Sequence, residues 1–315
     1  MQRFYITEYC SAQHDAWNEF VRKSKNGVFL FDRRYMEYHA DRFEDCSLMF
    51  FDERDRLVGL MPASRHGDTV ISHGGLTYGG VISNEEMKTA TMLHLFDALL
   101  GHLAGTGYAK LLYKPIPHIF HRIPAEEDLY ALFISNARMC RRDASSAIYL
   151  PERMKLAKGK REGVRKALRS GLSVRESRDF RTFFSIGRKV MRERHNTAPV
   201  HSGEEMALLK ERFPLNIQLH GSFDGETMMA GALTYLCGST VHVQYMYNSD
   251  EGLERGALDI ILDYLINGLY AGLKYFSFGI STEESGRYLN QGLIHQKEMF
   301  GARSVVHDFY ELELT

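Results

Sequence analysis

Apolar and polar residues follow the same order of patterns in both halves of the chain. In the first half, residues 47–63 read "SLMFFDERDRLVGLMPA", two apolar runs separated by a charged turn. Residues 216–236 have the same form, with "FDGE" at the turn. Apolar runs on either side of a short turn of Asp, Gly and charged residues are typical of a β-hairpin. We therefore expect one hairpin in each half.

Each predicted hairpin is followed by the same three elements. They are a strand, a helix with apolar residues at helical spacing, and a short strand. The segments are "TVISHGG", residues 92–105 and "YAKLLYKPI" in the first half, and "TVHVQYMYN", residues 257–272 and "KYFSFGI" in the second. Five elements in the same order predict a duplicated β-β-β-α-β unit. A hairpin requires antiparallel pairing and a strand–helix–strand unit gives a parallel pair, so we expect mixed sheets covered by helices.

Two helices are predicted at the start of each half. The segments are "HDAWNEFVRK" and "RRYMEYHADRF" in the first half, and "FRTFFSIGRKVMRER" and "SGEEMALLKERF" in the second. Ser202 with Glu205 three residues later predicts a capping box for the last of them. Between the halves, residues 151–171 are rich in Lys and Arg. This segment is either a solvated linker helix or a phosphate-facing surface, and we expect domains at 1–150 and 151–315.

Composition limits the classes of protein that fit. The chain has 315 residues, 44% of them hydrophobic and 25% charged, which is typical of a globular protein of two domains. Its formal charge of -1 gives no general field for binding nucleic acid. The four cysteines are scattered, the first residues "MQRFYITEYC" contain no apolar h-region, and no apolar run reaches about 20 residues. We expect a cytoplasmic protein with no metal site, no membrane span and no DNA partner.

The order of the predicted elements resembles a known fold. Two helices, three antiparallel strands, a helix and a parallel strand is the order of the GNAT N-acetyltransferase fold. Two such units in one chain resemble the Fem-type peptidyltransferases and their acyltransferase relatives. Three stretches are similar to segments of that family: "GGLTYGG" (74–80), "KREGVRKALRSGLSVRES" (160–177) and "LIHQKEMFGARSVVHDFYEL" (293–312). The resemblance implies a mixed α/β fold with two tandem GNAT-like acyltransferase domains.

The resemblance places a donor site after the third strand of the second half. There "DEGLERGAL" partly matches the GNAT pyrophosphate loop, Arg/Gln-x-x-Gly-x-Gly/Ala. Backbone amides at a helix start bind phosphate because their N–H groups and the helix dipole face the ligand. The expected donor contacts are Tyr245, Gly252, Arg255, Gly256 and Ala257. An ordinary strand-to-helix turn explains the same residues, so both interpretations stay open.

Two segments contain candidates for a general base. His195 and His201 lie around Pro199 in a predicted loop, and imidazole titrates near neutral pH. Glu283 lies in "ISTEESGRYLN", the polar loop that follows the last strand of the repeat, and is a base if burial raises its pKa. In the same loop, Ser281 and Thr282 are expected to orient the acceptor, and Arg287 is expected to hold an anionic group. A solvated connection has the same composition.

The resemblance also implies roles near the end of the chain. Lys297 matches the family's terminal lysine, which offsets charge on the donor phosphate or on the tetrahedral intermediate. Tyr310 in the last strand is either a proton donor to the leaving group or a core tyrosine. The first half has no equivalent phosphate loop, so we expect it to form the acceptor site. The residues assigned there are His73, Tyr78, Tyr113, Lys114 and His118.

These observations favour one function and leave two alternatives. The favoured function is transfer of an acyl group from acyl-CoA to an amine, on a small molecule such as a sugar nucleotide or on a cell-envelope precursor. The first alternative is aminoacyl transfer from tRNA, which is disfavoured because no long helical arm is visible and Gln296 replaces the family's aromatic residue. The second is a double-GNAT module that binds a ligand without turnover.

Overall fold

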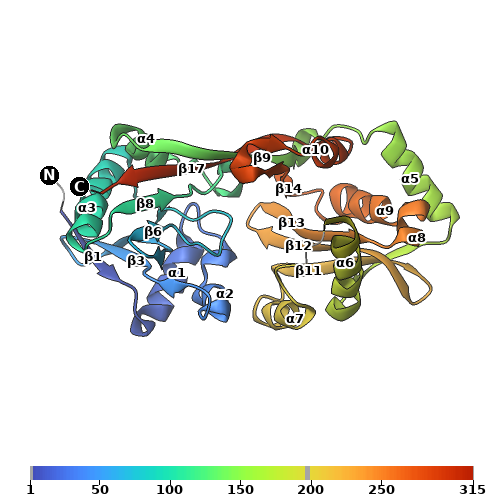
Figure 1. Cartoon of the computed structure of the whole chain (residues 1–315), viewed down its shortest axis with the longest axis horizontal. Helices are drawn as coiled ribbons and strands as arrows, with labels where there is room; N and C mark the ends of the chain where they lie inside the picture. Colours follow the sequence, from blue (N-terminus) through green and yellow to red (C-terminus); the bar gives the residue numbers. More distant parts are fainter. Residues whose placement is uncertain (1–2, 196–198, 315) are drawn as a thin grey trace. The chain divides into compact units, whose positions relative to one another are not determined.

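The computed structural model describes residues 3–195 and 199–314, without the side chains of His39, Arg194 and His195 (Figure 1). The chain divides into two compact units. Unit 1 comprises residues 1–144, 282–288 and 306–315, and unit 2 comprises residues 145–281 and 289–305. Segments near the C-terminus thus belong to both units. Across the described ranges, no helix combines the length and the apolar character that a membrane crossing requires.

Unit 2 is built on one mixed sheet. Its strands are β10 (Ser173–Ser177), β11 (Ile217–Asp224), β12 (Thr227–Cys237), β13 (Thr240–Asn248), β14 (Tyr275–Ile280) and the end of β9 (Arg138–Tyr149), in the order β10-β11-β12-β13-β14-β9. All neighbours are antiparallel except β13 and β14, which run parallel. The predicted hairpin is β11–β12, with Asp224 opposite Thr227 and Gly225 at a φ of 56°.

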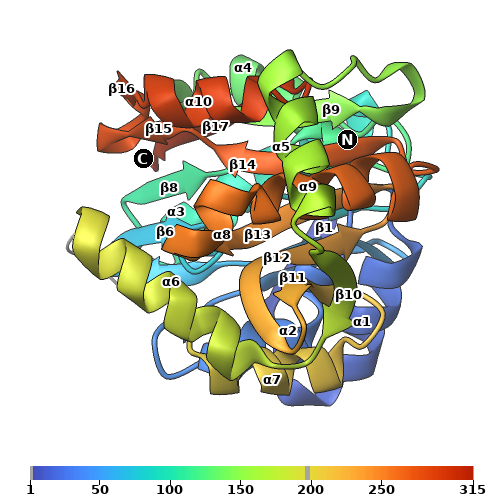
Figure 2. The same ribbon diagram turned by 90° about the vertical axis from the view of Figure 1, so that its right-hand side faces the viewer.

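Helices cover both faces of this sheet (Figure 2). Their bounds are α5 (Lys158–Arg169), α6 (Phe180–His195), α7 (Gly203–Arg212), α8 (Asp250–Arg255), α9 (Ala257–Tyr264) and α10 (Gln291–Glu298). The helix predicted at 257–272 ends earlier than expected as an α-helix and continues as a π-helical turn, Leu265–Leu269. The capping box predicted at Ser202 and Glu205 is present at the start of α7.

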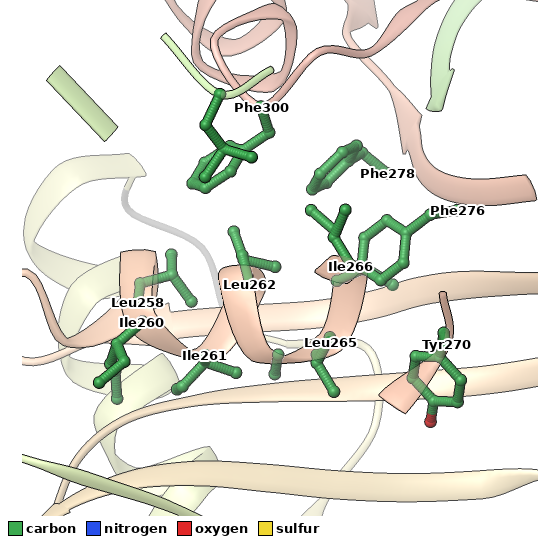
Figure 3. Close-up of a cluster of buried hydrophobic side chains, with 14 of the residues drawn as sticks. Leu258, Ile260, Ile261, Leu262, Leu265, Ile266, Tyr270, Phe276, Phe278 and Phe300 are labelled. Carbon is green, nitrogen blue, oxygen red and sulfur yellow. The ribbon is translucent and has the colours of Figure 1, made fainter. Parts of the chain in front are cut away.

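The core of unit 2 lies around α9. Ile261, Leu262 and Leu265 are completely buried, and Ala167 from α5 joins the same cluster. Figure 3 shows Leu262 on the side of Phe300, and Ile266 beside Phe276. A helix buried against the sheet, α5 and this aromatic group loses water from most of its surface, which is the main stabilising term in folding. The position of α9 against the sheet is therefore fixed by packing.

Most strands of unit 1 lie in two sheets. The first has the order β1-β3-β4-β7, and the second, to which the strands of unit 2 also belong, continues from β9 in the order β9-β17-β8-β6-β5-β2. The bounds are β1 (Phe4–Glu8), β2 (Glu44–Asp45), β3 (Leu48–Asp52), β4 (Leu57–Met61), β5 (Ser64–His66), β6 (Thr69–Ile71), β7 (Ile82–Ser83), β8 (Lys110–Tyr113) and β17 (Arg303–Glu313). The helices are α1 (His14–Lys23), α2 (Arg33–Met36), α3 (Thr89–Gly105) and α4 (Glu127–Ile134).

The repeat predicted from the sequence is visible in the pairing of each unit. The hairpin β3–β4 corresponds to β11–β12, and α3 connects the parallel strands β6 and β8 as α8 and α9 connect β13 and β14. The units differ in one respect, because the β3–β4 hairpin of unit 1 lies in a different sheet from its parallel pair. The expected mixed α/β fold class with a repeated unit is confirmed.

Candidate functional site

The parallel pairing of β13 with β14 is short and ends inside both strands. It covers three residue pairs, from Thr240 opposite Tyr275 to His242 opposite Ser277. Beyond this point β13 continues to Asn248 along β12, and β14 continues to Ile280 along β9. The pairing of β14 with β9 shifts register between Ser277 and Gly279, as at a β-bulge. Bulges are frequent next to active sites because they turn backbone and side chains out of the sheet pattern.

A buried lysine lies at the end of β14. The Lys297 side chain donates from Nζ to the Gly279 carbonyl at 2.9 Å, to the Ile280 carbonyl at 2.6 Å and to Ser281 Oγ at 2.8 Å. These acceptors match the three N–H donors of an ammonium group. Burial lowers the pKa of Lys297 to about 8. The predicted residues Lys297 and Ser281 are therefore in direct contact.

The cap of α10 holds Lys297 in this position. Asn290 accepts a hydrogen bond from the Leu293 N–H at 3.0 Å and caps the helix. The Asn290 N–H donates to the Ser281 carbonyl at 2.9 Å, so the helix start is bonded to the end of β14. An N-cap of this kind contributes roughly 1 kcal/mol and fixes the direction of the first helical turn. Lys297, in the last turn of α10, is thereby directed back to the strand end.

A histidine outside the sequence predictions lies at the same bulge. His242 Nδ1 is 3.1 Å from Ser277 Oγ, and both residues belong to the last parallel pair. The Gly279 N–H also donates to Ser277 Oγ, at 3.4 Å. Gly279 has a φ of 73°, and a Cβ added there would lie 3.1 Å from His242 Cε1. The backbone conformation therefore favours glycine at this position, and the missing Cβ leaves room beside the imidazole.

The predicted residues His201 and Tyr245 form a second contact in unit 2. His201 Nδ1 is 2.6 Å from the Tyr245 hydroxyl. The Tyr245 ring packs against Phe184 with centroids 5.5 Å apart and stacks on Tyr247 at 5.8 Å. Burial raises the pKa of Tyr245. The side chain of His195, the other predicted histidine base, lies outside the described residues.

Most of the predicted phosphate turn is engaged in local contacts. The Gly252 N–H donates to Ser249 Oγ, the N-cap of α8, and the first turn of this helix contains Asp250 and Glu251. Arg255 pairs with Asp224 and Glu251 and donates to the Ser170 carbonyl. A phosphate at this helix start has to replace the cap contact and approach two carboxylates.

Gly256 and Ala257 have packing roles in the same turn. Gly256 has a φ of 74° and separates α8 from α9. A Cβ on Gly256 would lie 2.3 Å from the Gly163 carbonyl oxygen of α5, so only glycine fits here. Ala257 is completely buried in the core. The participation of these residues in donor binding stays a prediction.

The polar loop after β14 belongs to unit 1 from Thr282 to Tyr288. It forms a small hairpin of β15 (Thr282–Glu283) and β16 (Tyr288–Leu289), and the Thr282 hydroxyl donates to Asp143 Oδ1 at 2.8 Å. Glu284, Ser285 and Gly286 all have positive φ. Glu283 and Arg287 are exposed. The expected role of Glu283 as a general base depends on burial of its carboxylate, and this side chain is exposed in the structure.

Unit 1 contains a second buried lysine held by carbonyl groups. Lys114, directly after β8, donates from Nζ to the His73 carbonyl at 2.6 Å and to the Leu76 carbonyl at 2.5 Å. Burial and, to a smaller degree, the Arg141 guanidinium lower the pKa of Lys114 to about 7. His73 itself is buried, with a φ of 63°. The structure thus brings together two of the predicted acceptor residues.

The tyrosines predicted in unit 1 take part in core contacts. The Tyr113 hydroxyl accepts from the Val81 N–H at 2.6 Å and donates to Asp128 at 2.7 Å. Burial raises the pKa of Asp128 to about 7, so this carboxyl loses charge near neutral pH.

Tyr78 and Tyr310 complete this group. Tyr78 packs on Phe120 with ring centroids 4.7 Å apart, and on His307 at 6.2 Å. Tyr310 lies opposite Tyr113 in the β17–β8 pairing, and its hydroxyl is 3.4 Å from Asp308. His118, the remaining predicted acceptor residue, is exposed.

Comparison with known proteins establishes the fold and leaves the activity to be proposed. No protein-family model matches the sequence, and a search of curated proteins finds no match. Among solved structures, FemX has a TM-score of 0.68 at 12% identity, covering 96% of each chain. L-PGS from Bacillus licheniformis has a TM-score of 0.62 at 13% identity, covering 96% of this chain and 92% of that one.

A third structure has a description that names the fold itself. A tandem GNAT protein from the clavulanic acid biosynthesis pathway has a TM-score of 0.52 at 8% identity, and 99% of each chain is covered. Identities this low demonstrate shared architecture alone. The resemblance stated from the sequence is therefore confirmed at the level of structure: the chain has the tandem GNAT fold that it shares with FemX and L-PGS.

Proposed function

We propose that the protein is an N-acyltransferase that transfers an acyl group from acyl-CoA to an amine, with the chemistry in unit 2. The carrying observation is that the β13–β14 pairing ends at His242 and Ser277, and the buried ammonium of Lys297 is bonded to the next carbonyls of β14. Hydrogen-bonding side chains and a fixed positive charge at one strand end can stabilise the negative charge that develops during acyl transfer. The shared tandem GNAT fold supports this assignment.

The proposed role of Lys297 is electrostatic. When an amine attacks a thioester carbonyl, the carbonyl oxygen gains negative charge, the C–N bond forms and the C–S bond breaks. The three Lys297 donors are used within the protein, so its charge acts on the intermediate through space. A fixed charge in a site of low polarity needs no reorganisation during the reaction. Because burial lowers the pKa of Lys297 to about 8, this charge is lost in alkaline solution.

The acceptor is proposed to be a primary amine on a sugar nucleotide or on a cell-envelope precursor. The proposed contacts are Lys114, as a cation for an acidic part of the acceptor, and the exposed Arg287 as another. Two of the three N–H groups of Lys114 are bonded to carbonyls, and the ammonium lies 6.0 Å from the Phe309 ring.

Aminoacyl-tRNA is the second candidate donor, and the outer face of α5 supports it. Lys158, Arg161, Lys166 and Arg169 are exposed, and none has an ion pair within the described part of the chain. The opposite face of α5 packs on α9 through Ala167 and Gly163. A row of cations on a rigidly mounted helix suits a phosphate backbone.

Donor binding separates the two candidates. The thermal unfolding of the protein is followed with acetyl-CoA, a longer acyl-CoA or uncharged tRNA, and free thiol release is measured with a panel of amines. A donor at a hundredfold excess over Kd stabilises a one-site protein by about 2.7 kcal/mol. We expect this stabilisation with an acyl-CoA, and thiol release that depends on the amine. Stabilisation by tRNA alone would replace the acyl-CoA proposal with the aminoacyl one.

A further inference from the structure

We propose that His242, oriented by Ser277, takes the proton from the acceptor amine. The assignment rests on the proposed function and names a residue for it. The sequence patterns favoured His195, His201 and Glu283 as bases, so His242 is a new candidate. It is supported by its place in the pairing, by its hydrogen bond and by the glycine beside it.

The first support is position. His242 and Ser277 form the last pair of the parallel β13–β14 ladder, and beyond this pair β13 stays paired with β12 and β14 with β9. Val241 and Val243, on either side of His242, are buried in the core around α9. Because successive side chains of a strand point to opposite faces, His242 lies on the face away from that core. It is only partly buried and so remains accessible to a substrate.

The second support is the hydrogen bond to Ser277. A hydroxyl oxygen has two acceptor lone pairs. Ser277 Oγ accepts one hydrogen bond from the Gly279 N–H, and His242 Nδ1 lies 3.1 Å away in place to donate the second. A proton on Nδ1 leaves the lone pair of the neutral ring on Nε2. Ser277 is buried and fixed in the sheet, so it holds the ring orientation, and the proposal assigns the Nδ1–H tautomer to His242.

The third support is the space at Gly279. Its missing side chain leaves room for the Cε1 edge of the imidazole, which an added Cβ would approach to 3.1 Å. The carbonyl of the same residue accepts from Lys297. One bulged glycine therefore borders the proposed base on one side and the fixed positive charge on the other. This arrangement puts proton removal and charge stabilisation at a single strand end.

The proposed step conserves atoms and charge. The amine nitrogen attacks the thioester carbonyl carbon and forms the C–N bond, and His242 Nε2 takes the proton that this nitrogen loses. The C–S bond breaks as the tetrahedral intermediate collapses, and the imidazolium returns its proton to the thiolate. The products are the amide and the free thiol, and His242 is again neutral.

The substitutions His242→Asn and His242→Gln test the assignment. Asn keeps an amide group near the place of Nδ1 and retains the contact with Ser277, but it cannot accept a proton. We expect kcat/KM to fall by roughly 10²–10⁴-fold in both variants. The limb of the pH–rate profile in which kcat/KM rises with pH near neutrality should also disappear. Imidazole added to His242→Ala should restore part of the rate. His102→Gln, on α3 of unit 1, is the control histidine substitution.

His201→Asn and a spectroscopic measurement sharpen the test. If His201→Asn removes the rise of kcat/KM with pH near neutrality and His242→Asn leaves this rise intact, His201 is the base and the proposal is wrong. A purely structural His242 would give lower unfolding temperatures with an unchanged pH profile. Nitrogen NMR of the ring should show the Nδ1–H tautomer in the wild type and a changed tautomer balance in Ser277→Ala, whereas an Nε2–H wild type would overturn the proposal. Absence of turnover in the wild type would refute the proposed function, and the role of His242 with it.

Discussion

At the residue scale, the two buried lysines are the most informative side chains. Each is held by backbone carbonyls, Lys114 by those of His73 and Leu76, and Lys297 by those of Gly279 and Ile280. Burial lowers the pKa of both. A buried ammonium is costly to keep, and shifted pKa values concentrate at functional sites. The sequence predicted both lysines as site residues. Lys297 was predicted from the family resemblance, and Lys114 from its place at the end of a predicted strand.

We predict that Lys297 makes both activity and stability depend on pH. The rate should fall above pH about 8, where the Lys297 charge is lost, and Lys297→Met should lower it by roughly 100-fold at neutral pH. Lys297 releases its proton at lower pH when folded than its ordinary pKa of 10.5 allows. The unfolded chain therefore binds more protons between these values, so wild-type stability should rise with pH there.

Urea unfolding of wild type and Lys297→Met across this pH range measures the second effect. The difference between the two proteins isolates Lys297, because Lys114 contributes in the same direction to both. Lys274→Met, at an exposed lysine of unit 2, is the matched control. Parallel stability curves for wild type and Lys297→Met would mean that the folded lysine titrates normally.

His242 shows which site residues the sequence left unmarked. "TVHVQ" alternates apolar and polar residues as any half-buried strand does, and a single histidine among fourteen carries no local signal. Its significance comes from the pairing with Ser277, which lies 35 residues away. Contacts of this separation depend on strand register, and register is set by the tertiary structure. Glu283 shows the converse, since a polar loop gave a signal but the structure leaves the carboxylate exposed.

At the element scale, local patterns predicted what local physics determines. The hairpins and the capping box at Ser202 depend on residues within a few positions of one another. The break between α8 and α9 was not predicted. It depends on Gly256, because glycine tolerates the left-handed backbone and also leaves room for Gly163 of α5. That approach is a tertiary contact.

We predict that Gly256 stabilises the fold whether or not it binds a donor. Gly256→Ala should lower the free energy of unfolding by about 1–3 kcal/mol, because the added methyl would meet the Gly163 carbonyl and the left-handed backbone is strained for alanine. The change is measured by urea denaturation. Gly159→Ala, on α5 with open space around its Cα, is the matched control and should be neutral or stabilise by up to about 1 kcal/mol.

Donor affinity in Gly256→Ala tests the other interpretation of the same residue. A destabilised variant with unchanged acyl-CoA affinity would assign Gly256 to helix packing alone. A loss of affinity at full stability would assign it to the donor site, and our packing argument would be wrong.

At the scale of the whole molecule, the C-terminal segment joins the fold of both units. β17 lies in unit 2 up to Val305 and in unit 1 from Val306 onward, where Tyr310 to Glu313 pair with β8. The repeat in the sequence did not predict that β17 is divided between the two units. A repeat describes the order of the elements along the chain and not which strands pair. The same limit explains why the separate sheet of β3 and β4 was not foreseen.

We predict that Leu312, three residues from the end of the chain, stabilises the unit built from the first half. Its side chain is 5% exposed and belongs to the core cluster that contains Leu99 and Leu111. Truncating a buried leucine to alanine removes its burial and leaves a cavity, which costs about 2–5 kcal/mol. Leu312→Ala should therefore accelerate amide exchange in α3 and β8 and leave the protection of α9 unchanged. Val306→Ala, at an exposed position of the same strand, is the control and should leave exchange in all three elements as in the wild type. Equal loss of protection in α3 and α9 would show that the two units unfold together, whereas unchanged protection in α3 would mean that the core of unit 1 does not depend on the last strand.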